Sequence, residues 1–147
     1  MKVLTLLCAG LLWASCAEEP DRLVGTTTED GRFDMSLEAV RDWVRPGQSL
    51  PIKVRVESLT GPLNDPWVAE IELVANNGNV SPSSVNVVFD GVAVDEAYTA
   101  ADSVFEAWIT FEAGSRIEAA SQGEIHALFL DARSTLKIRI TPELETE

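Results

Sequence analysis

The chain has 147 residues, of which 46% are hydrophobic and 24% charged, and its formal net charge is −13 at pH 7. A chain of this length indicates a single domain. The excess of acidic residues excludes a generic nucleic-acid binder and disfavours charge-driven binding to anionic lipid, because both need clustered Lys and Arg.

The first fifteen residues have the composition of a secretory signal peptide. Lys2 supplies a positive start, and an uncharged, mostly apolar run extends from Val3 to Trp13. A helix over this run rises only about 17 Å, whereas the hydrocarbon core of a bilayer is about 30 Å thick. A buried N-terminal helix of a cytosolic protein is the alternative, but the abrupt change to acidic residues after Ala17 argues against it. The pattern therefore favours export.

Two cleavage points compete around Cys16. Two small residues precede this cysteine, which resembles a bacterial lipobox, although Trp13 stands where Leu is typical. The alternative is ordinary cleavage after Ala17. We favour Cys16 as a lipid attachment site carrying acyl chains such as palmitate, because the polar segment after it is typical of a tether. The predicted organisation is a signal peptide over 1–15, a flexible tether over 16–31, a domain over 32–142 and an acidic tail over 143–147.

From Phe33 onward, apolar and polar residues alternate, which predicts half-buried β-strands. The clearest strand is 49–58, in which Leu50, Ile52, Val54 and Val56 share one face. Including this one, the predicted strands are 33–40, 49–58, 69–75, 85–89, 104–112, 124–130 and 135–141. Turn residues such as Pro, Gly, Asn and Asp separate them. Seven or eight short strands with apolar faces to cover predict an all-β, two-sheet antiparallel sandwich.

Two segments resemble bacterial immunoglobulin-like domains of the invasin/intimin type. They are VRPGQSLPIKVRV over 44–56 and IELVANNGNVSPSSVNVVFDGVAVDEAYTA over 71–100. The first has a Pro-Gly turn before an x-I-x-V-x-V strand, and the second has I-x-L-x-A-x-N-G-x-V-S-P followed by a D-G-V-A turn. The resemblance spans Phe33 to Ile140 and implies an immunoglobulin-like fold in a spacer, rod segment or adhesion module. The shared residues are turn and core positions, so the resemblance implies no ligand-binding residue.

The sequence offers little support for catalysis or metal binding. His126 alternates with the apolar residues Ile125 and Ala127, so we predict a surface position for it. Four neighbouring acids do not follow the order of a calcium loop, so we predict turn and surface residues, with a calcium site as the alternative. These acids are Asp90, Asp95, Glu96 and Asp102. The segment 79–81 has the form of a glycosylation sequon, and we interpret it as a turn. We predict no catalytic residue, no metal and no cofactor.

Three tryptophans follow the leader, namely Trp43, Trp67 and Trp108. We predict that they cover the ends or second face of the sandwich, because large aromatics are usually buried. An exposed, coplanar Trp43–Trp67 pair would instead favour a carbohydrate-binding module.

The sequence as a whole predicts a module lipid-anchored to the outer membrane or cell surface of a bacterium. Its role would be non-catalytic binding, adhesion or scaffolding, with a protein or glycan partner. A carbohydrate-binding module and, further, a small carboxylate- or metal-dependent enzyme are the alternatives. If cleavage follows Ala17, the protein would be periplasmic or secreted.

Overall fold

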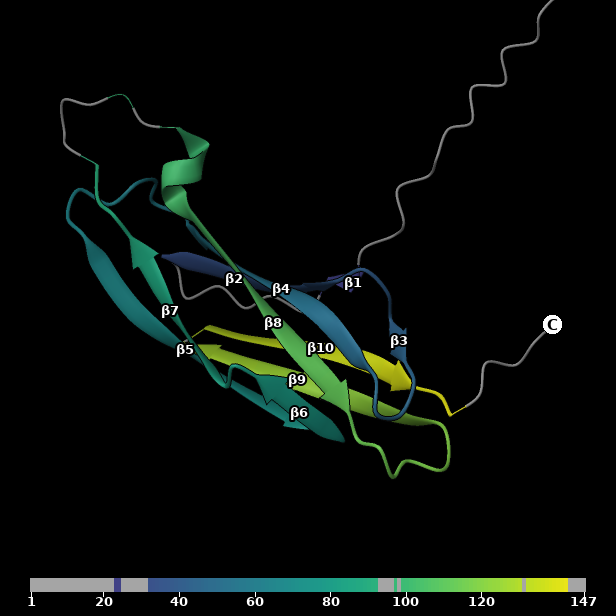
Figure 1. The fold of residues 1–147 in the computed structure, drawn as a ribbon. Helices are drawn as coiled ribbons and strands as arrows, with labels where there is room; N and C mark the ends of the chain where they lie inside the picture. The colour runs from purple at the N-terminus through teal and green to yellow at the C-terminus, as the bar shows by residue number, and fades with distance from the viewer. Residues whose placement is uncertain (1–22, 25–31, 93–96, 98, 131, 143–147) are drawn as a thin grey trace, which may run out of the picture.

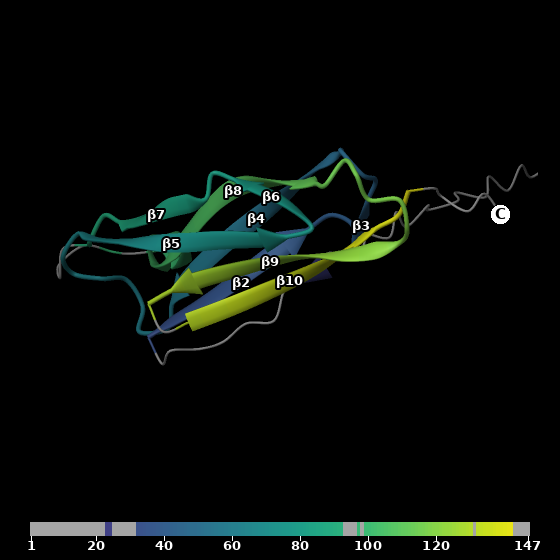
Figure 2. The same ribbon diagram turned by 90° about the horizontal axis from the view of Figure 1, so that it is seen from below.

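The computed structural model describes residues 23–24, 32–92, 97, 99–130 and 132–142. The predicted signal peptide, the lipid attachment site Cys16, most of the predicted tether and the acidic tail over 143–147 lie outside these residues. The described residues form two five-stranded sheets that pack face to face, as Figures 1 and 2 show. The predicted all-β, two-sheet sandwich is confirmed.

Each sheet combines strands that are far apart in the sequence. The first sheet contains, in spatial order, β1 (Leu23–Val24), β2 (Phe33–Ala39), β4 (Ser49–Ser58), β8 (Val104–Ala113) and β6 (Gly78–Ser81). The second contains β3 (Trp43–Val44), β10 (Ala132–Ile140), β9 (Ser121–Phe129), β5 (Trp67–Asn76) and β7 (Ser84–Phe89). A short 3-10 helix, η1 (Ala100–Ser103), leads into β8. The spatial order β2-β4-β8-β6 is that of strands A-B-E-D of an immunoglobulin sandwich, and β5-β9-β10 is that of C-F-G, but β7, which pairs with β5, follows β6 in the chain instead of preceding it.

The strand count and one pairing differ from the prediction of seven or eight antiparallel strands. The structure has three additional short strands, β1, β3 and β6. One pair is parallel, because β3 lies beside β10 with Trp43 opposite Arg139. A backbone hydrogen bond from Arg139 N to Asp42 O, 2.7 Å long, supports this pair. Strands of two to four residues contain too little alternation to be recognised from sequence.

Most of the core consists of side chains that the alternating pattern predicted to face inward, and Val44, Ala113 and Ala132 add to it from outside the predicted strands. In β4, the four apolar residues from Leu50 to Val56 are fully buried. An aromatic cluster fills one end of the sandwich, where the rings of Phe33 and Trp67 stack with centroids 4.9 Å apart. Phe129 meets both rings edge-on, at 5.5 and 5.8 Å. Burial of this apolar surface between the two sheets is the main stabilising contribution to the fold.

The chain changes sheets between β6 and β7. Strand β6 pairs with the end of β8, with Asn79 opposite Glu112, whereas β7 pairs with β5 in the other sheet. The interpretation of residues 79–81 as a turn is therefore wrong. The turn lies two residues earlier in the chain, at Asn77, which adopts the left-handed conformation with φ of 55°.

The first strand lies inside the segment predicted to be a tether. Leu23 pairs with Ala39 and Val24 with Glu38, which extends the first sheet beyond β2. The predicted tether over 16–31 therefore contains a short paired segment. No helix in the described part of the chain has the length and apolar character needed to cross a membrane.

Candidate functional site

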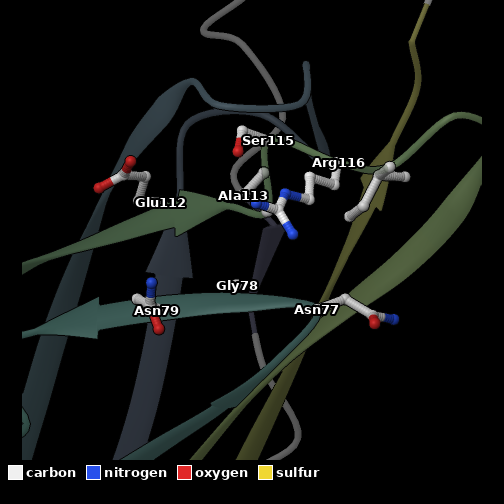
Figure 3. A pocket seen from close by; sticks show the side chains of 9 residues that line it. Asn77, Gly78, Asn79, Glu112, Ala113, Ser115 and Arg116 are labelled. Atoms are coloured by element: carbon white, nitrogen blue, oxygen red, sulfur yellow. The ribbon is translucent and has the colours of Figure 1, made fainter.

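A polar recess of about 460 Å³ lies at one end of the sandwich, beside the β6–β8 pair. Its walls come from the β5–β6 turn, the start of β6, the end of β8 and the loop that follows β8 (Figure 3). The lining residues are Asn77, Gly78, Asn79, Glu112, Ala113, Gly114, Ser115, Arg116 and Ile117. Loops gather at the ends of such sandwiches and commonly carry binding residues on a rigid frame.

The backbone around the recess is held by short contacts. The Asn77 side-chain amide donates a hydrogen bond to Gln122 O at 2.7 Å, and Gly114 N donates to Asn77 O at 3.0 Å. Gly78 allows β6 to lie against β8, because a Cβ at this position would clash with the Glu112 carbonyl oxygen. These contacts hold the β5–β6 turn against the end of β8.

Three polar side chains of the recess are available for binding. In the described structure, the side chains of Asn79, Glu112 and Arg116 make no hydrogen bond or ion pair. Figure 3 shows the Arg116 side chain extending from its loop toward the space between β6 and the end of β8. Asn79 and Glu112 face each other across the strand pair. The recess is thus lined by a guanidinium, an amide and a carboxylate that have no partner among the described residues.

The recess differs from the neighbouring charged surface of the first sheet. There, Lys53 lies 3.2 Å from both Glu38 and Glu106, and Arg55 lies 2.7 Å from Glu57. These basic side chains already form ion pairs with glutamates. Arg116 is the only basic residue lining the recess, and it has none among the described residues.

The three tryptophans predicted to be covered have three different environments. Trp67 lies in the aromatic cluster of the core, as predicted. Trp43 is half-buried, with the Arg41 guanidinium 4.7 Å from its ring centroid. The prediction is wrong for Trp108, whose side chain lies on the outer face of the first sheet and is 62% exposed. Trp43 and Trp67 therefore do not form the exposed, coplanar pair that would favour a carbohydrate-binding module.

His126 lies on the outer face of the second sheet, as predicted. Its Nδ1 is 3.1 Å from Thr135 Oγ1, and its Nε2 is 3.4 Å from Glu124 Oε2 and from the Asn76 side-chain nitrogen. Both ring nitrogens therefore have polar neighbours on the surface. His126 is therefore a surface histidine that is held by polar contacts with neighbouring side chains.

The four neighbouring acids are only partly described. Asp95 and Glu96 lie outside the described residues. Asp102 caps the short helix η1, since its carboxylate accepts hydrogen bonds from Thr99 N at 2.6 Å and Thr99 Oγ1 at 3.1 Å. In the described part of the chain, no three His, Cys, Asp or Glu side chains are close enough together to hold a metal. Asp102 therefore has a structural use that does not involve a cation.

A fragment of residues 31–142 should fold alone, and its thermal midpoint should be the same with and without EDTA. Every described core residue lies between Phe33 and Ile140, and the fragment contains no cysteine. A metal required for folding would couple its binding to stability. Circular dichroism melts test this. A midpoint that falls by many degrees in EDTA and returns with calcium would show that the acids near Asp95 form a metal site.

No family model and no curated protein matches the sequence. One solved structure with partial similarity is a family 123 glycoside hydrolase from Clostridium perfringens, studied for glycolipid glycan hydrolysis. The TM-score is 0.31 and the sequence identity 12%, over 67% of this chain. The chain spans 22% of the length of that hydrolase. A similarity this low assigns neither a family nor a function to the chain.

Sequence reasoning did not identify the residues of the recess. Asn79 belonged to a predicted turn, and Glu112 was the last outward residue of a predicted strand. Arg116 follows a Gly-Ser pair that marks a turn in the sequence. None of them stands in a motif, and the only available signal was the position of Arg116 in a loop between two strands.

Proposed function

We propose that the chain is a lipid-anchored, non-catalytic binding module of the bacterial cell envelope, related to the immunoglobulin-like modules that its sequence resembles. We further propose that it binds an acidic glycan. The observation that carries this proposal is the recess that Asn79, Glu112 and Arg116 line together, since their side chains have no hydrogen-bond or ion-pair partner among the described residues. The leader and Cys16 support the location, since a lipid anchor needs no basic surface.

The chemistry of the recess favours a sugar that bears a carboxylate. A guanidinium binds a carboxylate through two parallel hydrogen bonds, which suits Arg116 to a uronic acid. An amide and a carboxylate bind sugar hydroxyls, which suits Asn79 and Glu112 to the rest of the ring. The recess has a volume of about 460 Å³ and is open to solvent, so it can contact a sugar at the surface without enclosing it.

Trp108 supports a glycan with more than one sugar unit. Trp108 and Glu112 lie on the same outer face of the first sheet, four residues apart along β8. This separation is roughly 13 Å along a strand, which two or three linked sugars can span. An exposed tryptophan offers an apolar face with a polar edge, on which a sugar ring can stack. A glycan could then contact Arg116 through the carboxylate of one sugar and Trp108 through the ring of another.

Titration with galacturonic acid should perturb NMR signals of the residues that line the recess. We expect a dissociation constant in the millimolar range, which corresponds to a binding free energy of roughly −4 kcal/mol. Arg116→Ala should weaken this binding about tenfold or more, because it removes a charge-assisted hydrogen-bond pair. Arg133→Ala is a matched control, since Arg133 is also exposed and has no ion-pair partner in the described structure. Galactose should bind more weakly than galacturonate, and acetate should show whether a carboxylate alone suffices.

A trimer of galacturonic acid should bind more tightly than the monomer, and Trp108→Ala should abolish only this gain. The stacking of one ring on an exposed aromatic side chain is expected to contribute on the order of 1 kcal/mol. If neither the monomer nor the trimer perturbs the recess signals, or if Arg116→Ala binds as the unchanged protein does, the recess is not a uronic acid site.

A further inference from the structure

Three polar side chains from neighbouring strands meet on the outer face of the second sheet. Glu124 and His126 alternate with buried residues of β9, so both point outward. Asn76, at the end of β5, is the cross-strand partner of Glu124. The Nε2 atom of His126 lies 3.4 Å from Glu124 Oε2 and 3.4 Å from the side-chain nitrogen of Asn76. An imidazole, a carboxylate and an amide therefore meet at Nε2.

Further contacts orient the imidazole and the carboxylate toward each other. The Nδ1 atom of His126 lies 3.1 Å from the hydroxyl oxygen of Thr135, so a neutral ring that donates its Nδ1–H to this oxygen keeps an electron pair on Nε2. Glu124 Oε1 accepts a hydrogen bond from Gln122 Nε2 at 2.8 Å and lies 3.8 Å from Lys137 Nζ. In this tautomer two electron-pair donors, Nε2 and Oε2, face each other, an arrangement that a cation stabilises. Comparable outer contacts orient the ligands of natural metal centres.

The distances in this cluster are those of a tetrahedral metal site. Zinc binds imidazole nitrogen and carboxylate oxygen at about 2.0–2.2 Å, and two ligands at the tetrahedral angle are then roughly 3.3–3.5 Å apart. Both separations from His126 Nε2 are 3.4 Å. The amide of Asn76 presents its oxygen at the same place after a half-turn of its terminal torsion, which exchanges two atoms of similar size. The three side chains can therefore occupy three corners of a tetrahedron without movement of the backbone.

We propose that Asn76, Glu124 and His126 form a surface site for Zn²⁺ with a fourth position open to solvent. An imidazole ligand suits zinc, whereas calcium and magnesium take oxygen ligands. The side chains of His126 and Glu124 are 42% and 28% exposed, so an ion can reach them and keep a water molecule as its fourth ligand. The third donor is an amide, so the site contains only two side chains of the His, Cys, Asp and Glu types.

This metal site is independent of the glycan site and of folding. None of its three ligands lines the recess. The ligands lie on the outer face, away from the core, and β5 and β9 already pair from Ile71 to Asn76, so the expected insensitivity of the thermal midpoint to EDTA stands. The sequence predicted no metal, because Asn76 and His126 are 50 residues apart and form no motif.

Titration of the exported, untagged Cys16→Ala chain with Zn²⁺ tests the site, since this chain has no thiol once the leader is removed. His126 is the only histidine, so its ring signals in NMR spectra report on the site without overlap. Zn²⁺ should bind one to one in the micromolar range and shift the Nε2 signal, whereas Nδ1 keeps its proton. Mg²⁺ at the same concentrations should leave these signals unchanged, because it takes oxygen ligands.

Substitutions distinguish the proposed ligands from other surface residues. Glu124→Gln should weaken Zn²⁺ binding at least tenfold, because it removes a charged oxygen ligand. Glu70→Gln is the matched control, since Glu70 is exposed on the outer face of β5 and the change removes the same charge. Thr135→Val should weaken binding about tenfold because it no longer orients His126, and Thr135→Ser, which keeps the hydroxyl, should restore most of it.

Asn76→Asp tests the third ligand through a gain of binding, which a misfolded chain cannot produce. It replaces the amide with a carboxylate, a common zinc ligand, and should tighten Zn²⁺ binding about tenfold. Asn86→Asp, which adds the same charge at an exposed position of β7, should not. Zn²⁺ binding that is no tighter than that of Mg²⁺, or equal affinities of the Glu124→Gln chain and the unchanged chain for Zn²⁺, would overturn the proposal.

Discussion

Replacement of Cys16 with Ala should move the protein from the membrane fraction to the soluble fraction. A lipobox cysteine carries several acyl chains, and each buried CH₂ contributes about 0.8 kcal/mol to membrane binding. One chain alone binds only marginally, whereas several together anchor a protein stably. With a net charge of −13 and its basic residues dispersed, the rest of the chain has no basic patch to hold it at an anionic surface. Loss of the acyl chains should therefore release almost all of the protein.

Cys8→Ala provides the matched control for this experiment. Cys8 lies within the apolar run of the predicted leader, so this variant should remain in the membrane fraction. The intact mass of the unchanged mature protein decides between the two cleavage points. A chain that begins at Cys16 and carries the mass of acyl groups supports the lipoprotein, whereas an unmodified chain that begins at Glu18 contradicts it.

Phe129→Ala should lower the free energy of unfolding by about 3–5 kcal/mol. Phe129 is fully buried, and its ring meets those of Phe33 and Trp67 edge-on. Truncation removes these aromatic contacts and leaves a cavity at the end of the core, which the surrounding strands cannot fill. Since domains of this size are stabilised by roughly 5–15 kcal/mol, the thermal midpoint should fall by about 15 °C or more.

The adjacent residue supplies the comparison for this core substitution. Leu128 precedes Phe129 in β9 but faces outward and is 37% exposed. Leu128→Ala should therefore cost about 1 kcal/mol or less, because little buried surface is lost. Denaturant unfolding of both variants measures the difference. Equal losses would mean that Phe129 does not occupy the core in solution.

The fold class and most strand positions were predictable from sequence, because a strand that is buried on one face must alternate apolar and polar residues. The prediction for 49–58 agrees with the observed β4, and the predicted strand at 85–89 lies within one residue of β7. At the β9–β10 turn the alternation failed, because Leu130 ends the pattern in a left-handed turn conformation with φ of 52°. Short strands such as β3 and β6 were missed for a related reason, since their pairing depends on a distant strand rather than on their own sequence.

The sequence by itself determined the all-β class and most of the residues that form the core. It also predicts an exported chain with Cys16 as the lipid attachment site. Only the tertiary structure decided which surface positions meet. It placed Trp108 on an open face and Trp67 in the core, although both are tryptophans within predicted or observed strands. It also brought Asn79 of strand β6 and Arg116 of the loop after β8 to one recess. The physical reason is that alternation is a local consequence of burial on one face, whereas a site depends on contacts between strands that are distant in sequence.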